Sequence, residues 1–295
     1  GPTNDCKIRL VNPWRDETYL RNDLAYGLFK QMADSPDKRR DGIPVSWTEV
    51  FVNGHYYGLL EVSPAVRTQW LELEPFVEGQ MFPTLAYKQQ RSAITLAENN
   101  KYMMRQIEPS RRHGTFNEPL VELLSSLEES KTEEFLQEIK RSFNLDQMVD
   151  FYILMQFTQN YNGYPDRFVI NDILVKEPGP NGKFFLVPYD FDDTLGDLDY
   201  DDYNTEVFDR LLEEHPLFKI KVAERWQDLR KNIIVPEKIE RDLRKKQKLL
   251  EDFIQWDIEH WRKPNDLSYE EHVDELIENI RTRIKELDKR YTLKK

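Results

Sequence analysis

Residues 162–196 read NGYPDRFVINDILVKEPGPNGKFFLVPYDFDDTLG, and this stretch decides the fold around the predicted site. Two short apolar runs that favour β-structure, Ile173–Val175 and Phe184–Val187, flank a Pro-Gly-Pro-Asn-Gly segment that is typical of a turn. The pattern therefore predicts a β-hairpin whose turn centres near Gly179.

The register of this hairpin is expected to bring polar side chains together. The numbers of facing residues sum to roughly 359, so Asn171 should face about Pro188. Asp190 emerges just beyond that point. If the chain stays extended, Asp190 and Asp192 point to one side and Phe191 to the other, because side chains alternate along a strand.

A set of carboxylates and one carboxamide is what phosphoryl transfer requires. One carboxylate must lie near the acceptor hydroxyl, and oxygen ligands must hold the Mg²⁺ that bridges the nucleotide phosphates. Protein kinases use an Asp, four residues, an Asn, and then a hairpin that ends in a metal-binding Asp before a Gly. The same order occurs here in Asp166, Asn171, Asp190 and Gly196. The spacing alone leaves a solvated acidic turn as the alternative.

Motifs along nearly the whole chain point to one family. In chain order they are RDETYLRNDLA (15–25), VFVNGHYYGLLE (50–61), YK (87–88), DRFVIN (166–171) and PYDFDDTLG (188–196). Together they resemble the CotH family of atypical, spore-coat type protein kinases. The last motif departs from the family pattern at Tyr189, where Trp is usual.

The resemblance implies an α+β fold of the atypical protein-kinase-like bilobal kind. We expect a small α+β lobe over residues 1–64 and a larger, mostly helical lobe over residues 65–295, with the site between them. It also implies a location in a spore coat, in a cell envelope or outside the cell. The Gly-Pro start is typical of a protease scar, so a leader could precede it.

The resemblance further implies an ATP-dependent enzyme that uses Mg²⁺ or Mn²⁺ and phosphorylates Ser or Thr of a protein. Asp166 would orient and deprotonate the acceptor hydroxyl. Asn171 and Asp190 would hold the metal ion, with Asp192 assisting.

The nucleotide-binding side has fewer signals, because the sequence contains no G-x-G-x-x-G. We expect the phosphate-contacting strand to precede residue 1 or to be lacking. Lys7 and Arg9 are the early basic candidates, with Glu17 as their partner. Lys88 is a further candidate, and Glu61 would lie near a kinase-like hinge. A surface Lys and a structural Glu are the alternative interpretations.

Composition narrows the function classes. The 295 residues include 39% hydrophobic and 12% aromatic residues, enough for a sizeable core. A net charge of −12 argues against nucleic-acid binding, which favours a basic surface. No apolar run approaches the roughly 20 residues of a membrane helix, so we expect a soluble protein. The single Cys6 excludes an internal disulfide framework.

Local patterns predict the remaining elements. Asn53-Gly54 is the strongest short hairpin signal, and Asp16, Asn144 and Ser268 are helix-cap candidates. The expected strands are Lys7–Val11, Val45–Val52 and Tyr56–Val62. The expected helices are Glu17–Met32, Ala93–Gln106, Asn144–Gln159, Thr205–Glu213, Phe218–Lys231, Pro236–Trp261 and Ser268–Tyr291.

Three other interpretations of the sequence are possible alternatives to a kinase. Asp190–Thr194 also fits the DxDxT signature of haloacid-dehalogenase-type phosphatases, but those enzymes need further parallel strands after the motif, where this sequence predicts helices. Asp197–Asp201 imitates the start of an EF-hand loop, yet Asp202 and Phe208 replace its Gly and closing Glu, so we expect a solvated acidic loop. The third is a non-catalytic, pseudokinase-like binding or adhesion module.

Overall fold

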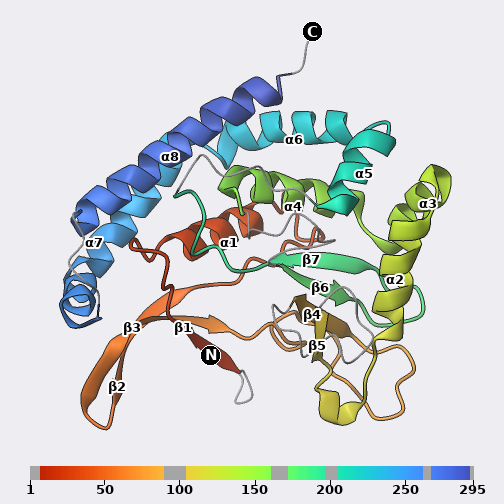
Figure 1. The fold of residues 1–295 in the computed structure, drawn as a ribbon, viewed down its shortest axis with the longest axis horizontal. Helices are drawn as coiled ribbons and strands as arrows, with labels where there is room; N and C mark the ends of the chain where they lie inside the picture. Colours follow the sequence, from red (N-terminus) through yellow and green to blue (C-terminus); the bar gives the residue numbers. More distant parts are fainter. Residues whose placement is uncertain (1–6, 90–103, 161–171, 197–204, 262–266, 293–295) are drawn as a thin grey trace.

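The computed structural model describes residues 7–89, 104–160, 172–196, 205–261 and 267–292 (Figure 1). These residues form a mixed α+β fold, as predicted. The strands are β1 (Ile8–Val11), β2 (Ser46–Val52), β3 (His55–Pro64), β4 (Leu85–Gln89), β5 (Met104–Glu108), β6 (Asp172–Lys176) and β7 (Phe184–Pro188). The helices are α1 (Arg21–Gln31), α2 (Glu118–Glu129), α3 (Thr132–Ser142), α4 (Leu145–Thr158), α5 (Glu206–Glu214), α6 (Phe218–Asn232), α7 (Pro236–Trp261) and α8 (Tyr269–Arg290), with a short 3-10 helix at Arg111–His113.

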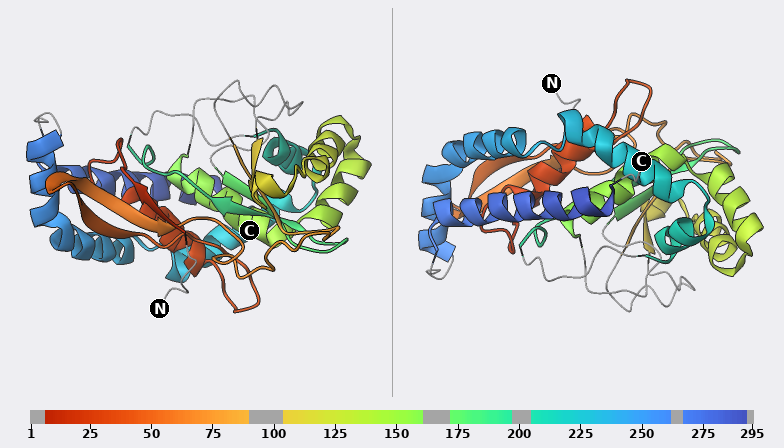
Figure 2. Two further views of the ribbon diagram at one scale, coloured as in Figure 1. Left: turned by 90° about the horizontal axis from the view of Figure 1, so that it is seen from below. Right: turned by 90° about the horizontal axis from the view of Figure 1, so that it is seen from above.

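Two small antiparallel sheets carry the strands. Their orders are β1-β3-β2 and β5-β4-β6-β7. In the view of Figure 1 the sheets occupy the lower half, and α1, α4, α6 and α8 lie above them. Figure 2 shows α2 and α3 at one end of the molecule and α7 with the start of α8 at the other.

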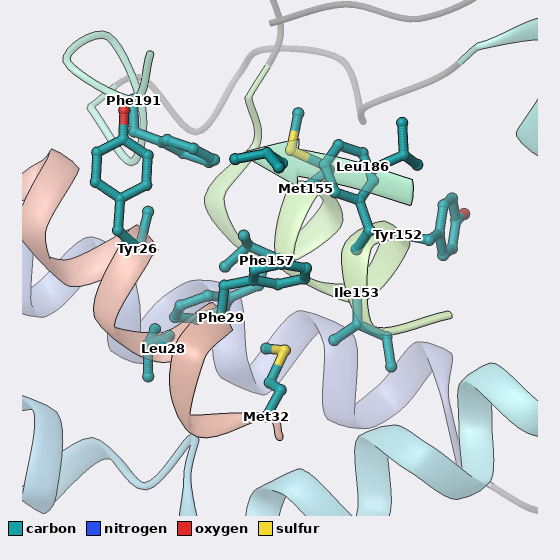
Figure 3. Close-up of a cluster of buried hydrophobic side chains, with 14 of the residues drawn as sticks. Tyr26, Leu28, Phe29, Met32, Tyr152, Ile153, Met155, Phe157, Leu186 and Phe191 are labelled. Atoms are coloured by element: carbon teal, nitrogen blue, oxygen red, sulfur yellow. The ribbon is translucent and has the colours of Figure 1, made fainter. Parts of the chain in front are cut away.

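Helix α4 forms the centre of the core. Asn144 caps it as predicted, because its side-chain oxygen accepts hydrogen bonds from the amides of Asp146 (3.0 Å) and Gln147 (3.2 Å). Every residue from 147 to 158 is buried, since α4 contacts α1, α6, α8 and β7. Figure 3 shows the resulting cluster, in which side chains of α1 and α4 pack together.

The predicted hairpin is confirmed as β6 and β7, but its register differs by one residue. Asp172, not Asn171, pairs with Pro188. The reason lies in the turn, where the amide of Glu177 donates to the carbonyl of Lys183 (2.9 Å), so that the turn centres on Pro180, one residue after Gly179.

The Asn53-Gly54 hairpin is also confirmed, as β2 and β3. Both turn residues have positive φ, 53° and 81°, as a type I′ turn requires. The hairpin is joined to α7 through Asp257, which accepts hydrogen bonds from the amide of Leu59 (2.8 Å) and the hydroxyl of Tyr56 (3.2 Å).

The first helix begins later than predicted, at Arg21 rather than Glu17. Tyr19 has a left-handed backbone with φ 58°, which interrupts a right-handed helix. The Asp16 carboxylate instead holds a turn, since it accepts from the amides of Thr18 and Arg21, both at 2.9 Å.

The region between Pro75 and Pro119 departs most from expectation. A helix over Ala93–Gln106 is wrong at its end, because Met104–Gln106 belong to β5 and pair with β4. The rest of that range lies outside the described residues. No element was predicted for β4, α2 or α3.

The last third of the chain is helical as predicted. Helices α5 to α8 start and end within about two residues of their expected limits. The capping box of α8 is present, with the Ser268 hydroxyl accepting from the amide of Glu271 (3.3 Å). Within the described part of the chain, no strand follows β7.

A single buried cluster contains side chains from both sides of Pro64. It includes Leu28 of α1 and Leu59 of β3 together with residues of α4 and α8. The expected arrangement in two lobes is therefore not confirmed, and the division at Pro64 stays a prediction.

Candidate functional site

The residues that follow β7 form a tight loop with Asp190 at its start. Asp190 has φ 67°, a left-handed backbone that side chains with a Cβ rarely adopt. The chain is therefore turned here rather than extended. The expected separation of side chains holds nevertheless, because Phe191 is fully buried while Asp190 and Asp192 are half-buried.

Hydrogen bonds from three directions fix this loop. The amide of Asp190 donates to the hydroxyl of Tyr26 (3.0 Å), and the amide of Phe191 donates to the side-chain oxygen of Asn22 (2.8 Å). The carbonyl of Asp190 accepts from the side chain of Asn160 (3.1 Å), which follows α4. The ring of Tyr26 meets that of Phe191 edge to face, with centroids 5.5 Å apart (Figure 3).

The far end of the loop is anchored as well. Arg21 donates from Nε to the carbonyl of Thr194 (2.6 Å) and forms a buried ion pair with Asp16. On α8, Asn279 donates to the carbonyls of Leu195 (3.0 Å) and Gly196 (2.7 Å). The RDETYLRNDLA motif thus supplies the groups that position the PYDFDDTLG loop.

The loop concentrates negative charge. Burial, and next the neighbouring Asp190 carboxylate, raise the pKa of Asp192 from 3.8 to about 6, against a lowering effect of a hydrogen bond from the backbone of Arg15. Asp193 pairs with the Arg15 side chain. The charge of Asp190 disfavours ionisation of Asp192, and this pair of half-buried carboxylates fits a divalent cation, which would neutralise both.

The ligand set is incomplete within the described residues. There, no group of three or more His, Cys, Asp or Glu side chains is arranged to hold a metal ion. Asp190 and Asp192 could supply two carboxylate ligands. The predicted metal ligand Asn171 and the predicted base Asp166 lie outside the described residues, as does the acidic segment Asp197–Asp201.

Positive charge lies at the ring of Tyr189, the residue before Asp190. The ammonium of Lys88 is 3.7 Å from the centroid of the Tyr189 ring, and the guanidinium carbon of Arg9 is 4.6 Å from it. Arg9 comes from β1 and Lys88 from β4, so strands of two different sheets meet here. Lys7 is exposed, and no ion pair joins Glu17 to Lys7 or Arg9.

Glu61 is buried in β3, with 3% of its surface exposed. Burial, followed by the Asp16 charge, raises its pKa from 4.5 to about 9, while a hydrogen bond from Asn22 acts in the opposite direction. One carboxyl oxygen accepts from the side chain of Asn22 (3.0 Å), and the other has no partner among the described residues. This burial favours a supporting role for Glu61, since Asn22 links it to the Asp190 loop.

Neither Asn22 nor Tyr26 was among the site residues predicted from the sequence. Both lie in or next to the RDETYLRNDLA motif, four residues apart, and so on one face of a helix. That spacing was a usable signal. What it could not give was the partner of this face, which comes from more than 160 residues further along the chain.

Comparison with protein families gives the class of this protein, because the family described as CotH kinase protein matches residues 4–287. The chain therefore belongs to the CotH kinase family. Comparison with curated proteins gave no match. Among the described residues, no helix is both long and apolar enough to cross a membrane.

Proposed function

We propose that this protein transfers the γ-phosphoryl group of ATP to a Ser or Thr hydroxyl of a protein substrate, with Mg²⁺ or Mn²⁺. The proposal rests on the arrangement of charged groups around Tyr189. The Asp190 and Asp192 carboxylates follow it directly, and the cations Arg9 and Lys88 contact its ring. A metal–nucleotide complex offers a cation to the former and phosphate oxygens to the latter.

The proposed step is a direct transfer. Asp166 accepts the proton of the acceptor hydroxyl, whose oxygen forms a bond to the γ-phosphorus as the bond to the β–γ bridging oxygen breaks and ADP leaves. Asn171 and Asp190 would hold the metal ion with the help of Asp192. The ion supplies neutralisation of the charge on the phosphates.

Lys88 and Arg9 are proposed to contact the phosphates. Both cations lie on the ring of Tyr189, directly before the proposed metal ligand Asp190. Because Asp190 directly follows Tyr189, we propose that one nucleotide contacts both groups. Membership of the CotH kinase family supports this class of activity.

The proposal is tested by incubating the protein with γ-labelled ATP, Mg²⁺ and candidate protein acceptors. We expect acid-stable label on Ser or Thr. Hydroxylamine-labile label on Asp190, with turnover of a simple phosphate ester, would instead indicate the haloacid-dehalogenase reading, in which this carboxylate is a nucleophile. The helices that follow β7 in the described residues argue against that reading.

A non-catalytic binding module is the second candidate, because the sequence lacks G-x-G-x-x-G. In this case no phosphoryl group is transferred to protein, whether or not ATP binds. Thermal stabilisation by Mg-ATP together with no labelled product, over a broad set of acceptors, would favour this candidate.

A further inference from the structure

We propose that Tyr26 and Asn22 of α1 are positioning residues that hold Asp190 in its metal-binding conformation. The inference rests on the proposed function, because it concerns how the metal ligand is oriented. The evidence for it is separate. It consists of the left-handed backbone of Asp190 and of the hydrogen bonds that the amides of Asp190 and Phe191 donate.

The left-handed backbone of Asp190 needs support. An Asp with φ 67° persists only where its surroundings favour that conformation over the ordinary ones. Two consecutive amides donate hydrogen bonds to α1. The amide of Asp190 donates to the hydroxyl of Tyr26 (3.0 Å), and that of Phe191 donates to the side-chain oxygen of Asn22 (2.8 Å). Because these acceptors are one helical turn apart, they fix the direction of the chain as well as its place.

The orientation of both acceptors is itself determined. Asn22 donates its amide hydrogens to Glu61 (3.0 Å), so its oxygen faces Phe191. Tyr26 is buried and packs edge to face on the Phe191 ring, which leaves its hydroxyl at the Asp190 amide. Burial raises the pKa of Tyr26 well above its usual value, so the hydroxyl stays neutral.

The direct test is Tyr26→Phe, which removes the hydroxyl and keeps the ring contact. ATP binding and phosphotransfer are measured as Mg²⁺ is varied, and Mn²⁺ binding is followed by electron paramagnetic resonance. Outer partners of metal ligands typically affect metal affinity 10–100-fold, so we expect the Mg²⁺ requirement to rise about tenfold. Saturating Mg²⁺ should restore most of the rate, and ATP binding without metal should not change.

The matched control is Tyr87→Phe. Tyr87 is also buried, and its hydroxyl donates to the carbonyl of Phe116, near Glu118, instead of accepting from an amide of the Asp190 loop. Its loss should lower thermal stability as much as Tyr26→Phe does without changing the Mg²⁺ requirement. An equal Mg²⁺ requirement in wild type and Tyr26→Phe, or an equal rise in both variants, overturns the inference.

Asn22 gives a second pair of variants should Tyr26→Phe fail to fold. Asn22→Asp keeps an acceptor for the Phe191 amide, whereas Asn22→Leu has similar size and lacks one. We expect the Mg²⁺ requirement of Asn22→Asp within about twofold of wild type and that of Asn22→Leu about tenfold higher. Equal requirements overturn the inference. A wild type without metal-dependent ATP binding overturns the proposed function as well, and so is a distinct result.

Discussion

After Tyr189 the chain turns into the Asp190 loop, whose backbone is held by side chains from α1, from α8 and from the end of α4. At Tyr189 itself the contacts are of another kind: the ring meets Arg9 and Lys88, two cations on strands of different sheets. The Asp190 loop is the acidic side, and directed hydrogen bonds fix it. Arg9 and Lys88 are the basic side, and their contacts with the Tyr189 ring tolerate movement. If the proposed function is correct, the proposed metal ligands are set in advance and the proposed phosphate contacts adjust to the nucleotide.

The largest effect should come from the proposed general base. Asp166→Asn is expected to lower phosphotransfer by about 10² to 10⁴-fold, because it removes general-base assistance. Mg-ATP affinity should be largely retained, since both sides of the Asp190 loop are unchanged. Steady-state rates on a verified substrate, with ATP binding measured in parallel, check this. A variant as active as wild type would remove Asp166 from the base role.

Glu61, which Asn22 links to the acidic side, should have a predictable effect on the free energy of unfolding. Glu61 has a pKa raised from 4.5 to about 9, so its protonated form stabilises the fold at low pH and this contribution is lost as pH rises through 9. Glu61→Gln should therefore be more stable than wild type by up to about 3 kcal/mol at pH 7, an advantage that shrinks towards pH 4. Denaturant unfolding between pH 4 and 9 measures it.

The control for Glu61→Gln is Glu118→Gln, which removes an exposed charge rather than a buried one. If Glu61→Gln showed the same pH dependence as wild type, the buried and protonated state of Glu61 would be wrong. The acidic side would then be less desolvated than its contacts indicate.

The basic side should respond in ligand affinity rather than in stability. Lys88→Met keeps the length of the side chain and removes its charge, so ATP affinity should fall about tenfold, or 1.4 kcal/mol. The Mg²⁺ requirement and the melting temperature without ligand should change little. Calorimetric titration with and without Mg²⁺ distinguishes these results. A lost Mg²⁺ response in Lys88→Met would contradict the division between the two sides.

The smallest effect concerns pH. Because the pKa of Asp192 is about 6, a proton competes with the metal ion near that pH. Mg²⁺ affinity should be about half its plateau at pH 6 and fall further below it. For the metal-free protein, the free energy of unfolding depends on pH with the opposite sign. Protonated Asp192 favours folding below pH 3.8, and that contribution is lost as pH rises through 6. Asp192→Asn should remove both dependences.

Much of the fold was accessible from the sequence, because local signals dominate it. The Asn53-Gly54 turn, the Asn144 cap and the Ser268 capping box each depend on a few neighbouring residues, and each is present. The two failures have different causes. Met104–Gln106 pair with another strand, β4, instead of forming a helix. Asp16 holds a turn through local hydrogen bonds, because its carboxylate accepts from the amides of Thr18 and Arg21.

Of the site, the hairpin that precedes Asp190 and Asp192 was predictable from the sequence. Their spacing alone left a solvated acidic turn as the alternative, and the metal site stays a prediction. No rule of spacing could place Arg9 and Lys88 on one aromatic ring, since β1 and β4 belong to different sheets. The roles of Tyr26 and Asn22 depend on packing between α1 and a loop far along the chain.

The central claim is that the Asp190 loop binds a metal–nucleotide complex, and thermal unfolding with Mg-ATP tests it most directly. At a hundred times its dissociation constant, a ligand that binds only the folded protein adds about 2.7 kcal/mol to the free energy of unfolding. We expect such a rise for wild type with Mg-ATP, a smaller one with ATP and chelator, and no Mg²⁺ effect for Asp190→Asn. An identical Mg-ATP shift in wild type and Asp190→Asn, or no shift in wild type, would contradict it.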